Sequence, residues 1–163
     1  MPKEKPEELM ISSQEELQQS VMYLEYIKEQ ITALKEQTEV LELAIKEHNQ
    51  AIDTLKDFEN LDSKSEILVP IGADSLVYAK VADASKVILN IGSGLAKEEK
   101  LKTAIKTLTT RIEKIEESKG KILETINNLT QQATMLTSAI EEKYKEIQSA
   151  QSAENILRPP NVS

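Results

Sequence analysis

Residues 17–55 read LQQSVMYLEYIKEQITALKEQTEVLELAIKEHNQAIDTL, a stretch without glycine or proline. Alternate steps of three and four residues from Leu17 select twelve positions, of which nine are aliphatic and three, Ser20, Thr38 and His48, are polar. A hydrophobic period of about 3.5 residues is typical of a helix that packs along one seam against another helix. We therefore expect a coiled-coil helix over residues 13–60, with a capping pair at Ser13 and Glu16.

A second seam of the same kind follows in residues 98–151. The same stepping from Leu101 selects fourteen positions, and only Lys119 and Lys143 among them are polar. Two matching seams on one chain predict an antiparallel helical hairpin. In that pairing Thr38 falls level with Lys119 and Gly120, so we expect a weak or kinked point where both seams are polar.

The segment between the helices, residues 61–97, changes to a period of two. Four short apolar runs are separated by the turn sequences Gly72-Ala73-Asp74, Asp83-Ala84-Ser85 and Gly92-Ser93-Gly94. This pattern predicts two successive β-hairpins, with Pro70 at an edge or a bulge because proline lacks an amide hydrogen. The expected fold class is mainly α with a small β region: a helical coiled-coil hairpin joined by two β-hairpins.

Apolar side chains are expected on both faces of these hairpins. About thirty residues cannot close a core alone, so we expect several subunits to pool their strands in an oligomer. The candidate oligomerisation residues are Ile67, Val69, Ile71, Leu76, Val77, Tyr78, Val81, Val87, Leu89 and Ile91.

At the other end of the helical hairpin, apolar residues leave the seam, and Tyr26 and Met135 also lie off it. Exposed methionine and tyrosine form a deformable apolar surface that suits partners of varied sequence. The flexible ends are expected at residues 1–12 and 152–163, and they contain five of the candidate client-binding residues. The full set is Leu9, Met10, Ile11, Leu17, Met22, Tyr23, Tyr144, Ile147, Ile156 and Leu157. The alternative is incidental exposure or packing against a neighbouring helix.

Composition excludes several classes of function. With 28 acidic and 20 basic side chains the net charge is −8, which disfavours nucleic acid and acidic lipid as partners. There is no cysteine for disulfides or thiolate metal sites, and no apolar run long enough to span a bilayer. Since Met1–Glu8 lacks the apolar core of a signal peptide, we expect a cytoplasmic protein.

No catalytic or cofactor motif emerges. His48 is the only histidine and occupies a seam position, where a structural role is expected. Gly92-Ser93-Gly94 lacks the ending of a phosphate-binding loop and is interpreted as a hairpin turn. The pair Glu141-Glu142 is interpreted as surface charge, and Glu98-Glu99 also as the acidic start of a helix. We expect no enzyme, no cofactor and no metal site.

The chain has a long helix, then two hairpins, then a second long helix. The hairpins contain Ile67-Leu68-Val69-Pro70-Ile71-Gly72-Ala73 and Val87-Ile88-Leu89-Asn90-Ile91-Gly92-Ser93-Gly94. This arrangement resembles the alpha class of the prefoldin family. The resemblance implies a hexamer of two alpha with four beta subunits, with a β-barrel body and coiled-coil tentacles. It further implies that the tentacle tips hold unfolded client proteins without ATP and deliver them to a group II chaperonin. Some archaeal relatives of the alpha type form filaments of one subunit, and the hairpins suit either assembly.

Two other classes of function stay open beside the chaperone. A structural scaffold or filament protein would form long polymers or bind one defined partner, and would not protect an unrelated unfolded protein. An enzyme is the weakest of the three, because it needs a pocket with convergent catalytic groups and the sequence indicates none.

Overall fold

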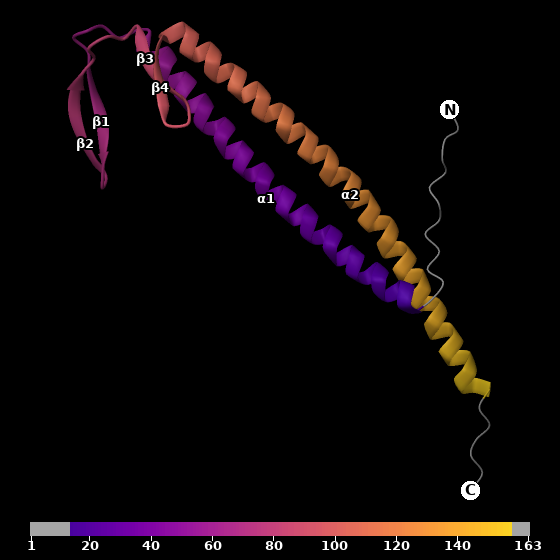
Figure 1. The fold of residues 1–163 in the computed structure, drawn as a ribbon. Coiled ribbons are helices and arrows are strands. Elements are labelled where there is room, and N and C mark those ends of the chain that lie inside the picture. The colour runs from indigo at the N-terminus through magenta and orange to yellow at the C-terminus, as the bar shows by residue number, and fades with distance from the viewer. Residues whose placement is uncertain (1–13, 158–163) are drawn as a thin grey trace, which may run out of the picture. The chain divides into compact units, whose positions relative to one another are not determined.

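The computed structural model describes residues 14–157, with side chains as far as residue 153. Helix α1 (Gln14–Phe58) is followed by strands β1 (Glu66–Gly72), β2 (Ser75–Lys80), β3 (Lys86–Gly92) and β4 (Leu95–Lys100), and then by helix α2 (Leu101–Leu157) (Figure 1). This order of elements confirms the predicted helical hairpin with two β-hairpins between its helices. Leu9, Met10 and Ile11 lie outside the described residues, as do the side chains of Ile156 and Leu157.

The chain divides into two compact units, and each is considered separately. Among the described residues, the helix-pair unit comprises residues 14–38 and 121–157, and the hairpin unit comprises residues 39–120. The division falls after Thr38 and Gly120, where the sequence predicts that both seams are polar. Thr38 is buried, and its hydroxyl donates a hydrogen bond to the Leu34 carbonyl at 2.9 Å.

The helix-pair unit has an apolar core along the predicted seam. Its buried residues come from both helices and run in opposite directions along them: Leu17, Leu24 and Ile27 of α1, with Leu136 and Ile140 of α2. The side chain of Ile27 is only 1% exposed to solvent. Full burial of such a side chain stabilises a fold by roughly 1.5 to 3 kcal/mol, so these residues and the partly buried ones packed against them stabilise this helix pair.

The hairpin unit continues the seam with a second cluster. Ile52 of α1 packs with Leu108 and Ile112 of α2, and Leu89 of β3 packs against the same cluster. The seam lysine of this unit is also paired, since Lys119 Nζ lies 2.6 Å from a Glu42 carboxylate oxygen. The charge of Lys119 is therefore paired by the facing helix.

The two β-hairpins share one design, offset by twenty residues. Glu66 pairs with Lys80 as Lys86 pairs with Lys100, and each hairpin has a bulge before its turn, at Ile71 and at Ile91. Pro70 was expected at an edge or a bulge, and it lies in a strand of a two-stranded sheet, next to the register shift at Ile71. Each hairpin is closed by a backbone hydrogen bond just beyond its last strand: the Val81 amide donates to Ser65 at 3.1 Å and the Leu101 amide donates to Ser85 at 2.9 Å.

The start of α2 differs from the predicted residue 98. Glu98, Glu99 and Lys100 belong to β4, where Glu98 pairs with Ile88 and its carboxylate lies 3.0 Å from Lys86 Nζ. The interpretation of Glu98-Glu99 as a helix N-terminus was wrong, because cross-strand pairing overrides the helix propensity of this charged run. The helix also continues to Leu157 instead of ending at residue 151.

The turn of the first hairpin contains a residue in an unfavourable conformation. Ala73 and Asp74 have φ angles of 48° and 53°, and the second hairpin has Ser93 and Gly94 at 52° and 74°. A left-handed conformation costs a non-glycine residue about 1 to 2 kcal/mol. Ala73→Gly should therefore stabilise the protein by about 0.5 kcal/mol after the entropy of glycine is subtracted, measured as a rise in the thermal midpoint.

The same substitution at Ala96 is the matched control. Ala96 lies in β4, opposite Asn90, and is not among the residues with positive φ. Ala96→Gly should therefore destabilise the protein by about 0.5 to 1 kcal/mol. Equal effects of the two substitutions would contradict a turn-specific strain.

Candidate binding surfaces

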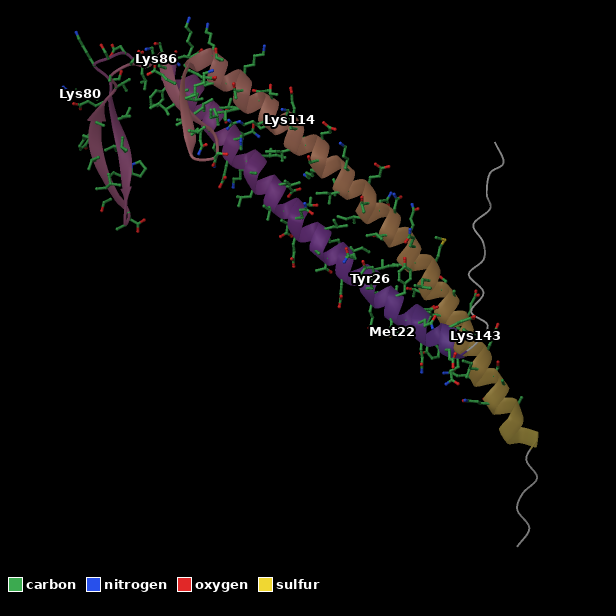
Figure 2. The ribbon with its side chains drawn as sticks, in the orientation of Figure 1. Met22, Tyr26, Lys80, Lys86, Lys114 and Lys143 are labelled. Carbon is green, nitrogen blue, oxygen red and sulfur yellow. The ribbon has the colours of Figure 1, made fainter. Side chains whose placement is uncertain are left out.

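The outer side of α1 carries an exposed aromatic cluster. Met22, Tyr23 and Tyr26 are 62%, 53% and 55% exposed. The two tyrosine rings stack with centroids 6.3 Å apart and an interplanar angle of 18°. Tyr26 lies four residues after Met22 and three after Tyr23, so its side chain is a neighbour of both on the helix surface. The seam residues Leu24 and Ile27 are buried in the core instead. We call Met22, Tyr23 and Tyr26 the α1 patch; Figure 2 shows Met22 and Tyr26 on one helix.

Helix α2 adds three exposed apolar residues to the helix-pair unit, of which Leu123 is 47% exposed. Met135 is 50% and Tyr144 is 49% exposed. Near Tyr144, Lys143 is half-buried and its ammonium group lies 2.9 Å from the Glu146 carboxylate (Figure 2). That lysine is thus part of an ion pair on the helix surface, and Tyr144 keeps its ring accessible.

The structure separates the predicted client-binding residues. Met22, Tyr23 and Tyr144 are exposed, as a binding role requires. Leu17, by contrast, is 4% exposed in the core of the helix-pair unit, and Ile147 is partly buried against that core. Both occupy seam positions, so their apolar surface serves helix packing in this structure. Tyr26 was missing from the chosen residues, although its spacing from Met22 and Tyr23 places it on the same face.

The first β-hairpin is apolar on both faces. Ile67, Val69 and Ala79 are half-buried on one face, whereas Leu68 and Tyr78, which are cross-strand partners, are 53% and 81% exposed on the other. Of the predicted oligomerisation residues, those with exposed side chains are Ile71, Leu76, Val77, Tyr78 and Ile91. Leu68, Ile88 and Leu95 are equally exposed but were not chosen from the sequence.

Some of the predicted oligomerisation residues are covered within the chain. Val81 is buried, Val87 is half-buried, and Leu89 packs against Ile52, Leu108 and Ile112. The second hairpin is held to α2 by further contacts: Arg111 Nη2 donates to the Asn90 carbonyl at 2.7 Å, and Thr107 donates to the Glu99 carboxylate at 3.4 Å. One face of β3–β4 is therefore occupied by the chain's own helix.

The loops before the two hairpins contain aspartates with lowered pKa values. The Asp62 carboxylate accepts a hydrogen bond from the Lys64 amide at 2.9 Å and one from the Ser65 hydroxyl, which together lower its pKa below 3.8. The hydroxyl and the amide of Ser85, at 2.6 and 2.8 Å, lower the pKa of Asp83 likewise. The hydrogen bond with Glu98 raises the pKa of Lys86.

These two carboxylates predict an acid-dependent loss of stability. Because their pKa values are lower in the folded than in the unfolded chain, their contribution is complete above the unfolded value of 3.8 and is lost as pH falls through the folded pKa. Changing Asp62 and Asp83 together to alanine should lower the thermal midpoint at neutral pH but leave it almost unchanged near pH 2. A difference that persists undiminished at low pH would contradict this assignment.

Within residues 14–157, the structure offers little for catalysis or metal binding. No group of three or more histidine, aspartate or glutamate side chains is placed to hold a metal ion in this part of the chain. His48 Nδ1 lies 2.7 Å from the Ala44 carbonyl oxygen, so this nitrogen is engaged with the helix backbone. No helix among the described residues is long and apolar enough to cross a membrane.

Two long helices packed as a hairpin, with two β-hairpins between them, define a class of coiled-coil proteins, and comparison with known proteins identifies the family. Residues 27–146 match the model of the prefoldin subunit family. The chain belongs to the prefoldin family, a family of non-enzymatic chaperones, in agreement with the expectation that it is not an enzyme.

Individual relatives agree with this assignment. The chain is 31% identical over 123 residues to prefoldin subunit alpha of Archaeoglobus fulgidus, covering 76% of this chain and 90% of the relative. It is 31% identical over 140 residues to prefoldin subunit alpha of Methanoculleus marisnigri, covering 85% and 93%. Filamentous PFD from Methanocaldococcus jannaschii has a similar fold, with a TM-score of 0.65, 24% identity and coverage of 71% of this chain and 95% of that chain.

Proposed function

We propose that this chain is the alpha-type subunit of a chaperone that holds unfolded client proteins without ATP and delivers them to a group II chaperonin. The observation that carries the proposal is the α1 patch, where Met22, Tyr23 and Tyr26 are exposed beside a closed seam in a chain of the prefoldin family. Each such contact is weak. Affinity arises when several subunits engage one client together.

The hairpins supply the proposed means of assembly. Leu68, Leu76 and Tyr78 are exposed on one face of β1–β2, and each sheet has only two strands, so both of its strands are edges. Strands and faces of this kind are stabilised by pairing with another chain. We infer an intersubunit β-barrel in which two alpha subunits combine with four beta-type subunits, in the cytoplasm.

A second candidate is a structural scaffold, namely a filament made of this chain alone. The similarity in fold to filamentous PFD from Methanocaldococcus jannaschii favours it. The same exposed hairpin residues would then join identical copies. A filament of this chain has no need of beta-type subunits, which separates the two candidates experimentally.

Native mass spectrometry tests the proposal, first on the purified chain and then with a beta-type subunit added. The hexamer requires a mixed species with two copies of this chain and four of the partner. An ATP-free assay then measures aggregation of a chemically unfolded client. Mixed hexamers that suppress aggregation are the expected result, whereas a monomer that neither assembles nor protects would overturn the proposal. Long polymers without protection would favour the scaffold.

A further inference from the structure

The helix face that contains most of the α1 patch is acidic. Counted from Met22, the helix has Glu15 seven residues before it, Glu25 three after, Tyr26 four after and Glu29 seven after. Side chains at these spacings share one helix face. All of these side chains are exposed. Carboxylates thus flank the methionine and the stacked tyrosines along the same surface.

These carboxylates are not neutralised nearby. Lys28 is the only basic residue between Gln14 and Leu34; it lies three residues after Glu25 but six from Met22, on the flank of this face. Among the residues that the structure describes, no ion pair involves Glu15, Glu25 or Glu29. The three carboxylates therefore exceed the one nearby lysine, and the α1 patch borders a net negative surface.

An aromatic surface flanked by carboxylates is complementary to one kind of unfolded segment. Tyrosine rings attract guanidinium and ammonium groups through their faces, methionine accommodates apolar side chains of varied shape, and the carboxylates attract the same cations at longer range. A segment with aspartate or glutamate beside its apolar residues meets repulsion on this surface.

We propose that the α1 patch, together with Glu15, Glu25 and Glu29, selects unfolded segments in which lysine or arginine alternates with apolar residues. This inference rests on the proposed function, because it specifies which clients that surface takes. Acidic or uncharged segments of equal apolar content would bind more weakly.

The test uses two fluorescent, unfolded peptides with the same leucine and phenylalanine content, one carrying lysine and arginine and the other aspartate and glutamate. Binding to the assembled full-length protein is measured by fluorescence anisotropy at low salt. We expect the basic peptide to bind about tenfold more tightly, as two or three weak surface charge contacts and a cation–π contact allow. The difference should shrink in about 0.5 M salt, where screening acts within a few ångströms.

A pair of charge variants localises the effect. Glu25→Gln with Glu29→Gln removes two carboxylates beside the α1 patch and should reduce the preference to about threefold or less. Glu39→Gln with Glu47→Gln makes the same change in net charge at exposed positions of α1 in the hairpin unit and should leave the preference intact.

The outcomes separate this inference from the proposed function. Equal affinity for the two peptides, or equal loss of preference in both double variants, would overturn the charge selection while the protection of clients stands. Failure to bind either peptide, together with failure to protect an unfolded protein, would overturn both.

Discussion

Changing Met22, Tyr23 and Tyr26 together to serine is expected to remove most of the protection of unfolded clients while the protein stays folded and assembled. The three side chains are more than half exposed, so each can lose its apolar surface without opening the seam. If each buries enough surface against a client to contribute about 0.5 to 1 kcal/mol, the triple variant should require at least about tenfold more protein for half-maximal suppression of aggregation.

The chain offers a matched control for this variant. Val40 and Leu43 are also exposed on α1, at 66% and 57%, but belong to the hairpin unit. Changing both to serine removes apolar surface from the same helix and should leave protection within about twofold of the original. Equal loss in the two variants would show that the α1 patch has no special part in client binding.

Introducing charge into the first hairpin is expected to abolish assembly. Leu76 and Tyr78 are exposed in β2, where we place the contact with neighbouring subunits. Leu76→Glu with Tyr78→Glu would bury two unpaired carboxylates in that contact at a cost of several kcal/mol. The dissociation constant of the assembly should rise by at least about a hundredfold, seen in native mass spectrometry as monomers.

Lys64→Glu is the control for the hairpin variant. It changes the net charge by the same amount, at an exposed position in the loop before β1, and replaces no strand residue. Assembly should survive this change. A double variant that assembles as readily as the control would place the subunit contact elsewhere.

The sequence predicted the helices well because their packing is repetitive. Every turn of the seam repeats the same requirement for an aliphatic side chain, so residues such as Ile27 and Ile112 could be assigned to the core from spacing alone. The hairpin turns were also predictable from sequence. Gly72 and Gly92 have φ angles above 100°, a conformation that favours glycine, so these glycines marked the turns.

The start of α2 could not be predicted in the same way. Lys97, Glu98, Glu99 and Lys100 have high helix propensity, and nothing within that run indicates a strand. What decides their conformation is pairing with β3, which is a long-range contact that a local pattern does not contain.

The candidate sites were only partly predictable, because apolar character does not say whether a side chain is covered. Leu17 and Leu89 were chosen as binding and assembly residues, yet the structure places both in contacts within the chain. Tyr26 was passed over, although its ring stacks on Tyr23. Leu17 is a seam position and Tyr26 is not, so helical spacing distinguishes the covered residue from the exposed one.

A photo-crosslinking experiment tests the central claim most directly, namely that one part of the chain binds clients and another joins subunits. A benzophenone amino acid is placed at Tyr23, at Val40 or at Tyr78 in otherwise identical proteins, which are assembled, mixed with an unfolded client and irradiated. The account predicts client adducts at position 23, few adducts at position 40 and subunit-to-subunit adducts at position 78. Client adducts spread equally over the three positions, or an absence of subunit adducts at position 78, would contradict it.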